Sequence, residues 1–211
     1  MKSQFLPVLS RTLSALAVCS LLGATAFAQA PAAPGAPATG TAPAAPAEKP
    51  KPLAAVDETY VKNASRGFSY LIQMAKTLPA STEPTQQTQN RLRDSTVKDL
   101  TAAQTALGKI IEAHGMKVPT ELVGNDKADV DRITKGFTKT NLPKGFENKP
   151  LLDWTGEMLK ESKRLDHETE TIAKQGLDAD LKTFATNYGP SIRTVYTAAE
   201  GLDKSLKTKK K

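Results

Sequence analysis

Residues 150–206 hold two stripes of helical period, and they constrain the fold of this chain more than any other stretch. Apolar side chains, with one threonine, recur at steps of three, four or seven, with Lys, Glu and Asp between them. The positions are Leu151, Trp154, Met158, Leu165, Thr169 and Ile172, then Leu181, Phe184, Tyr188, Ile192, Val195, Ala199, Leu202 and Leu206. This spacing predicts two amphipathic α-helices. Gly176 is placed to end the first in a left-handed conformation, and Asp178 to cap the second, so we expect an antiparallel hairpin.

Two further helices are predicted upstream of this hairpin. The first covers residues 57–78 and ends before Pro79, and the second follows Pro84 and ends at Gly115. Each has about 20 residues or more, which corresponds to about 30 Å of helix. Because the loop between them is short, we expect the two helices to be antiparallel neighbours.

The segment of residues 116–149 joins the two predicted hairpins. It is rich in Gly and Pro, and only residues 127–138 show a helical pattern. Its length lets the second and third long helices run parallel. The predicted fold for residues 56–206 is therefore an all-α, ferritin-like four-helix bundle, with one long crossover that carries a short extra helix. Pro190 is expected to kink or restart the last helix.

Residues 1–28 have the pattern of a secretory signal peptide. Lys2 and Arg11 provide a basic start, residues 13–24 are apolar, and the small residues Ala26 and Ala28 predict cleavage before Gln29. The apolar run is too short to favour a membrane span. We therefore expect an exported protein of the periplasm, with association to the outer membrane as a further expectation.

Residues 29–55 are predicted to form an Ala/Pro-rich, disordered tether, because proline removes backbone donors and almost nothing bulky is present to build a core. The single cysteine, Cys19, lies in the predicted signal peptide. The mature protein would then lack cysteine, which excludes disulfides and thiolate metal sites.

The positive charge of the chain is concentrated outside the predicted domain. Residues 207–211 form a basic tail that contains Lys207, Lys209, Lys210 and Lys211, whereas residues 53–206 carry equal numbers of basic and acidic side chains. A neutral domain gives no support for nucleic-acid binding. The tail is interpreted either as a frayed, solvated end or as a contact to an anionic surface or another cell-envelope component. The sequence identifies no other partner.

A search for chemistry-bearing patterns finds one alternative site. No Glu-x-x-His pair of the di-metal bundle type occurs, no Ser, Thr or Cys is aimed at a histidine, and His114 is interpreted as structural at the end of the second helix. No cofactor is therefore predicted. The alternative metal-binding set consists of Asp166, His167, Glu168 and Glu170. In this set, the helical pattern predicts that His167 faces outward.

Three short motifs carry a resemblance to a known family. They are residues 116–122 (MKVPTEL), residues 176–185 (GLDADLKTFA) and the proline at position 190. With these motifs, the chain from Tyr60 to Leu202 resembles a widespread bacterial family of exported, ferritin-like proteins of unknown function, often labelled as outer-membrane proteins. The resemblance implies the same bundle fold and an envelope location.

The resemblance also implies positions for a metal site. Family members place an Asp-His pair in helix two and in helix three, a histidine after the proline of helix four, and a glutamate in helix one. The matching residues here are Leu100, Ser162, Val195 and Phe68. Asp99 and Glu161 remain as the preceding acids, but the histidines are replaced. A metal function of the relatives is therefore not expected here.

The sequence thus predicts a non-enzymatic helical-bundle protein of the bacterial cell envelope, with a metal-handling ferritin-like protein as the alternative. Leu100 and Val195 fall on the apolar stripes of their helices, so they are expected in the core. Trp154 is expected near one end of the bundle, partly buried against the crossover.

Overall fold

A computed structural model describes residues 50–80, 82, 86–118, 120–139, 141–144 and 147–208. Five α-helices occur there: α1 (Ala55–Thr77), α2 (Gln87–Ala113), α3 (Gly124–Thr138), α4 (Lys149–Gln175) and α5 (Ala179–Thr208). No strand occurs in these ranges, which confirms the predicted all-α fold. None of these helices is long and apolar enough to cross a membrane. The predicted signal peptide, most of the predicted tether and residues 209–211 of the tail lie outside the described residues.

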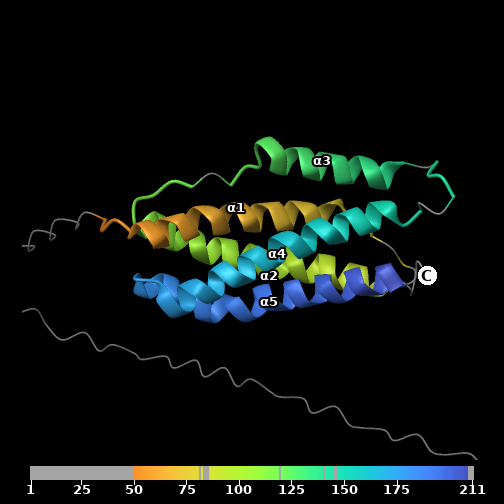
Figure 1. Cartoon of the computed structure of the whole chain (residues 1–211). Helices are drawn as coiled ribbons and strands as arrows, with labels where there is room; N and C mark the ends of the chain where they lie inside the picture. The colour runs from red at the N-terminus through yellow and green to blue at the C-terminus, as the bar shows by residue number, and fades with distance from the viewer. Residues whose placement is uncertain are drawn as a thin grey trace, which may run out of the picture. The chain divides into compact units, whose positions relative to one another are not determined.

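The four long helices lie side by side, and each contacts two antiparallel neighbours (Figure 1): α1 and α5 each pack against α2 and α4. His114, at the end of α2, contacts Lys51 just before α1 and Asp178 between α4 and α5. Helices α1 and α5 therefore begin, and α2 and α4 end, at the same end of the assembly. We call it the His114 end, and the opposite one the Trp154 end.

Helix α3 lies outside the four long helices, against α1 and α4 (Figure 1). Ile133 is buried, and Val130 and Phe137 pack beside it against the core. Because α3 packs against α1, more than one side of α1 is buried. Phe68 and Tyr70, two residues apart and so on different sides of the helix, are both buried.

Buried side chains from all four long helices form one apolar core. Leu100 of α2 is 0 % exposed and Val195 of α5 is 1 % exposed, which confirms that both are core residues. Burying a side chain of this size typically contributes about 1.5–3 kcal/mol. The stripes that predicted the helices therefore also identified the faces that the helices bury.

The two glycines that were predicted to end helices behave differently. Gly115 has a φ of +66°, the left-handed conformation that glycine adopts without strain. Gly176 has φ −55° and ψ 148°, so the predicted left-handed conformation is wrong. A Cβ at Gly176 would lie 2.7 Å from the carbonyl oxygen of Ile172, so this position needs glycine for close approach. Asp178 Oδ1 accepts the Leu181 N–H at 2.9 Å, which confirms the predicted cap.

Helix α5 continues through Pro190 as one helix, so the predicted restart is wrong. Proline inside a helix removes one backbone hydrogen bond and costs about 3 kcal/mol. Buried side chains on both sides of the proline offset this cost, since each contributes about 1.5–3 kcal/mol. They include Leu181, Phe184, Ile192 and Val195.

Trp154 is fully buried, so the prediction of partial burial is wrong. Its indole N–H donates to the carbonyl oxygen of Met74 at 2.8 Å. Met74 lies in the last turn of α1, where carbonyl groups lack partners within the helix. The end of α1 therefore covers the indole ring and also satisfies its only polar group.

The segment before α1 is attached to the helices. Leu53 packs against the core, and the carbonyl oxygen of Lys51 lies 2.6 Å from Nδ1 of His114. Pro50 lies close to Gly115, where an added Cβ would come within 3.2 Å of its ring. Within the C-terminal part of the predicted tether, Pro50, Lys51 and Leu53 therefore contact the helices, although residues 50–52 are exposed.

Candidate functional site

Two residues of the alternative metal set face α5. Asp166 and Glu170 lie one turn apart on α4, and Arg193 of α5 approaches them at 3.2 Å and 3.1 Å, respectively. A guanidinium group between two carboxylates neutralises the charge that would attract a metal ion. This pair therefore acts as a contact between α4 and α5.

The other two residues of that set point elsewhere. Glu168 accepts a hydrogen bond of 2.6 Å from Arg164, on the side of α4 that faces α1, whereas His167 is exposed, as the helical pattern predicted. The four side chains therefore do not converge. Within the ranges that the structure describes, no group of three or more His, Cys, Asp or Glu side chains could hold a metal ion.

The positions implied by the resemblance fall one on each long helix. All four are at most 1 % exposed: Phe68, Leu100, Ser162 and Val195. Phe68 packs edge-on against Phe184, with ring centroids 6.2 Å apart. Asp99 and Glu161, the retained acids, are half-buried. Three hydrocarbon side chains and one hydroxyl do not fit a metal ion, which needs imidazole, carboxylate or thiolate ligands.

A group of ion pairs within α4 contacts α1 through one backbone carbonyl. Arg164 donates to Glu161, to Glu168 and, at 3.3 Å, to the carbonyl oxygen of Asn63 on α1. The hydrogen bonding that Arg164 donates to Glu161 is the main cause that raises the pKa of Arg164. A Cβ on Gly67 would lie 2.9 Å from the guanidinium, so glycine makes room for the group. Sequence analysis missed it, although the spacing of these acids around Arg164 was a visible signal.

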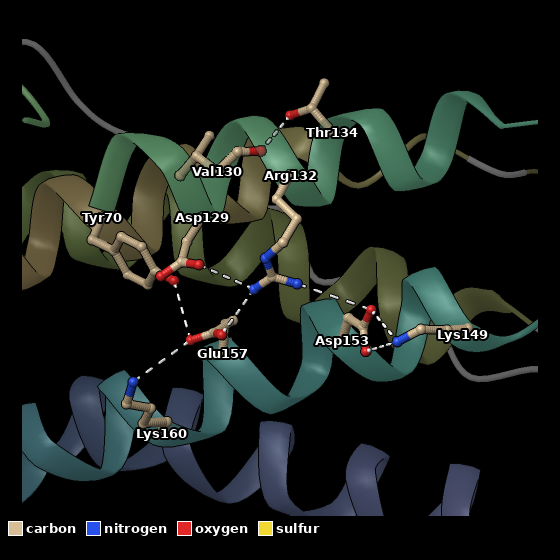
Figure 2. A network of polar contacts seen from close by, with 9 residues as sticks. All are labelled: Tyr70, Asp129, Val130, Arg132, Thr134, Lys149, Asp153, Glu157 and Lys160. Carbon is tan, nitrogen blue, oxygen red and sulfur yellow. Dashed lines mark hydrogen bonds and ion pairs between the residues drawn. The ribbon is translucent and has the colours of Figure 1, made fainter. Parts of the chain in front are cut away.

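A second polar network attaches α3 to α1 and α4 (Figure 2). Arg132 of α3 donates to Asp129 and to Glu157 of α4, both at 3.1 Å. The Tyr70 hydroxyl of α1 donates to the other carboxylate oxygen of Glu157 at 3.4 Å. Burial, followed by the charge of Glu157, raises the pKa of Tyr70. The network therefore joins three helices, α1, α3 and α4.

A pocket of about 490 Å³ lies between α1 and the segment that leads into α3. Arg66 and Asp126 form one side of it, where Arg66 Nη2 donates to Asp126 at 2.6 Å. This hydrogen bond lowers the pKa of Asp126. Lys62 and Lys117 also line the pocket, but Glu121 opposes them, so its charges nearly balance.

A second hollow of the surface is a depression of about 550 Å³ between α1 and α2, near the Trp154 end. Three of its described lining residues are cations, Lys76, Arg93 and Lys98, and Asp94 is the one acid among them. We call it the basic depression. A hollow on α3 has the same excess of two positive charges, from Arg132, Lys135 and Lys139 against Asp131, but Ala128 is the one apolar residue in its described lining. The basic depression adds Leu78, Pro79 and Val97 to its cations, so it is the best candidate for a binding surface.

Comparison with known proteins adds no relative from which a site could be transferred. The chain matches no known protein family, no curated protein and no solved structure at a significant level. The functional argument therefore depends on the residues and the geometry described above.

Proposed function

We propose that this chain is an exported, non-enzymatic helical-bundle protein of the bacterial cell envelope, which acts by binding through its surface. One observation carries the proposal: the interior positions at which the resemblance implies metal ligands hold packed side chains. Phe68, Leu100 and Val195 supply no atom that could bind a metal or act in acid–base chemistry. The chemistry expected of a ferritin-like interior therefore has no residues to perform it.

We include a ferritin-like origin in the proposal. Two antiparallel hairpins, α1–α2 and α4–α5, joined by one long crossover make up the connectivity of such bundles. The motifs at residues 116–122 and 176–185 support the same assignment. In this interpretation, apolar side chains replaced the ligands and the scaffold was kept.

The polar side chains support a structural rather than a catalytic use. Arg132 and Arg193 each connect two helices through carboxylates, and Arg164 connects α4 to α1 through the backbone carbonyl oxygen of Asn63. A catalytic group has to be free to exchange a proton or to attack a substrate. Charges that are tied into contacts between helices do not meet this requirement.

Export is tested with the full chain expressed in a bacterial host that has a periplasm. We expect a mature protein that begins at Gln29 in the periplasmic fraction, as determined by mass spectrometry. The matched control is Ala28→Tyr, because a bulky side chain at the cleavage position blocks the peptidase. Recovery of the uncleaved, unaltered chain in the cytoplasm would refute the envelope assignment.

The metal-handling alternative is tested by elemental analysis of protein purified without a histidine tag. We expect less than stoichiometric iron, zinc and copper. Stoichiometric metal that survives dialysis, or a reproducible turnover by the pure protein, would overturn the non-enzymatic proposal in favour of the alternative.

A further inference from the structure

The basic depression is built by residues from two helices. Lys76 lies in the last turn of α1, and Arg93 and Lys98 lie in the first half of α2. Its remaining lining is Leu78, Pro79, Ala80, Val97 and Asp94. The hollow is open and wide, so it suits a broad surface rather than an enclosed small molecule.

The cations of the depression are largely uncompensated. Asp94 accepts a hydrogen bond of 2.7 Å from Arg93, its neighbour in sequence, so its charge is already engaged. Lys76 and Lys98 are exposed and have no carboxylate partner in the part of the chain that the structure describes. Arg91, also exposed, lies seven residues before Lys98 and therefore on the same face of α2.

Helix dipoles do not change the sign of this charge. At the Trp154 end α1 and α5 terminate and α2 and α4 begin, so the positive and negative dipole ends offset one another. Side chains therefore determine the potential. The first turns of α2 and α4 contain no acid, whereas at the His114 end α1 begins with Asp57 and Glu58 and α5 with Asp180.

We propose that the basic depression binds the phosphate headgroups of an anionic lipid bilayer; this partner deepens the proposed envelope function and rests on it. Lysine ammonium groups on long stems reach phosphates, while Leu78, Pro79 and Val97 offer apolar contact below them. Residues 207 and 208, the described part of the predicted basic tail, are a weaker candidate for binding lipid phosphates. The ammonium of Lys207 is held by Asp203 at 2.7 Å.

The position of the depression favours this partner. The chain enters α1 at the His114 end, about 30 Å from Lys76 along the helix at 1.5 Å per residue. The entering segment contacts His114 and Gly115 at that end. A bilayer at the Trp154 end can therefore contact the depression without displacing the segment that enters α1.

The test is sedimentation of the purified protein with vesicles of equal parts phosphatidylglycerol and phosphatidylcholine. We expect binding at low salt that weakens at physiological salt, and no binding to pure phosphatidylcholine. Lys76→Gln/Lys98→Gln should weaken partitioning on the order of tenfold or more, since each lysine near an anionic surface contributes severalfold. The control Lys109→Gln/Lys182→Gln removes the same charge from exposed sites near the His114 end and should bind normally.

Several outcomes would overturn the proposal. Equal losses in the two double variants would mean that net charge alone drives binding, and loss only on removal of residues 207–211 would assign binding to the tail. Displacement by millimolar inorganic phosphate would indicate a small-anion pocket instead of a lipid surface. If the protein is exported but binds no vesicles, this inference fails and the envelope function stands; if it binds vesicles but stays in the cytoplasm, the envelope function fails.

Discussion

Nε2 of His114 lies 3.3 Å from a carboxylate oxygen of Asp178, although 63 residues separate them in sequence. The other ring nitrogen, Nδ1, donates to the carbonyl oxygen of Lys51 at 2.6 Å. The backbone N–H of Asp178 in turn donates to the buried carboxylate of Asp57 at 2.8 Å. One imidazole thus joins the entry to α1, the end of α2 and the turn between α4 and α5.

The first prediction is that His114→Ala weakens this end of the protein. It removes the hydrogen bond to the Lys51 carbonyl oxygen and the 3.3 Å contact with the Asp178 carboxylate, so we expect a loss of about 1–3 kcal/mol in the free energy of unfolding. Proteolysis before α1 should become faster because Lys51 is released. The control is His167→Ala, the same change at an exposed position of α4, and it should shift stability by less than about 0.5 kcal/mol. If His114→Ala and His167→Ala lower the free energy of urea unfolding equally, the proposed role of His114 in holding this end together is contradicted.

The second prediction concerns the core. Leu100→Ala should lower the free energy of unfolding by about 2–5 kcal/mol, because it removes buried hydrocarbon and leaves a cavity. Leu177→Ala is the matched control, because Leu177 is 74 % exposed whereas Leu100 is 0 % exposed. Thermal melting of both variants measures the difference. Unchanged stability of Leu100→Ala would show that the burial of this face of α2 is wrong.

The third prediction uses the single tryptophan of the chain. Because Trp154 is fully buried, its emission should be strongly blue-shifted in the folded protein and poorly quenched by acrylamide. Trp154→Phe removes the hydrogen bond to Met74 and leaves a smaller ring, so we expect a loss of about 1–3 kcal/mol. Emission at the wavelength of free tryptophan in the folded state would contradict the full burial of the side chain.

The fourth prediction is a pH dependence from Asp126. The hydrogen bond from Arg66 lowers the pKa of this carboxyl. A group with a lowered folded-state pKa adds stability above its unfolded pKa, about 4, and this contribution is lost as the pH falls through the folded value. Arg66 is well exposed, so the pair should contribute only about 0.5–1 kcal/mol.

Asp126→Asn tests this contribution. The variant should be less stable than the unaltered protein at neutral pH and equally stable at strongly acid pH, as measured by urea unfolding. Asp131→Asn breaks only an exposed contact with Lys127 inside α3 and serves as the control. A destabilisation by Asp126→Asn that persists unchanged at acid pH would exclude the ion pair as its cause.

The fifth prediction tests the ferritin-like proposal. Leu100→His, Ser162→His and Val195→His together place three imidazoles on α2, α4 and α5, and we expect the variant to fold and bind zinc. Binding should raise its melting temperature with zinc concentration, because the metal binds the folded state. The control Thr101→His, Lys163→His and Thr194→His uses the adjacent exposed positions. A folded triple variant without zinc binding would remove the support for the implied ligand positions.

The sequence by itself determined the helices and their buried faces. Periodicity placed Leu100 and Val195 in the core, and glycine, proline and capping residues marked the helix ends to within a few residues. These signals are local, because a side chain's place on its own helix depends only on its spacing. Of the kink or restart predicted at Pro190, the restart was wrong, because packing on both sides of the proline offsets a local cost.

Only the tertiary structure decided which polar groups meet. The four candidate ligands, Asp166, His167, Glu168 and Glu170, are consecutive or nearly so in sequence, yet two face α5, one faces α1 and one faces solvent. The reason is that successive residues of a helix point about 100° apart, so closeness in sequence does not make a site. The basic depression has the opposite origin, since Lys76 and Lys98 belong to different helices and share one hollow only because α1 and α2 pack together.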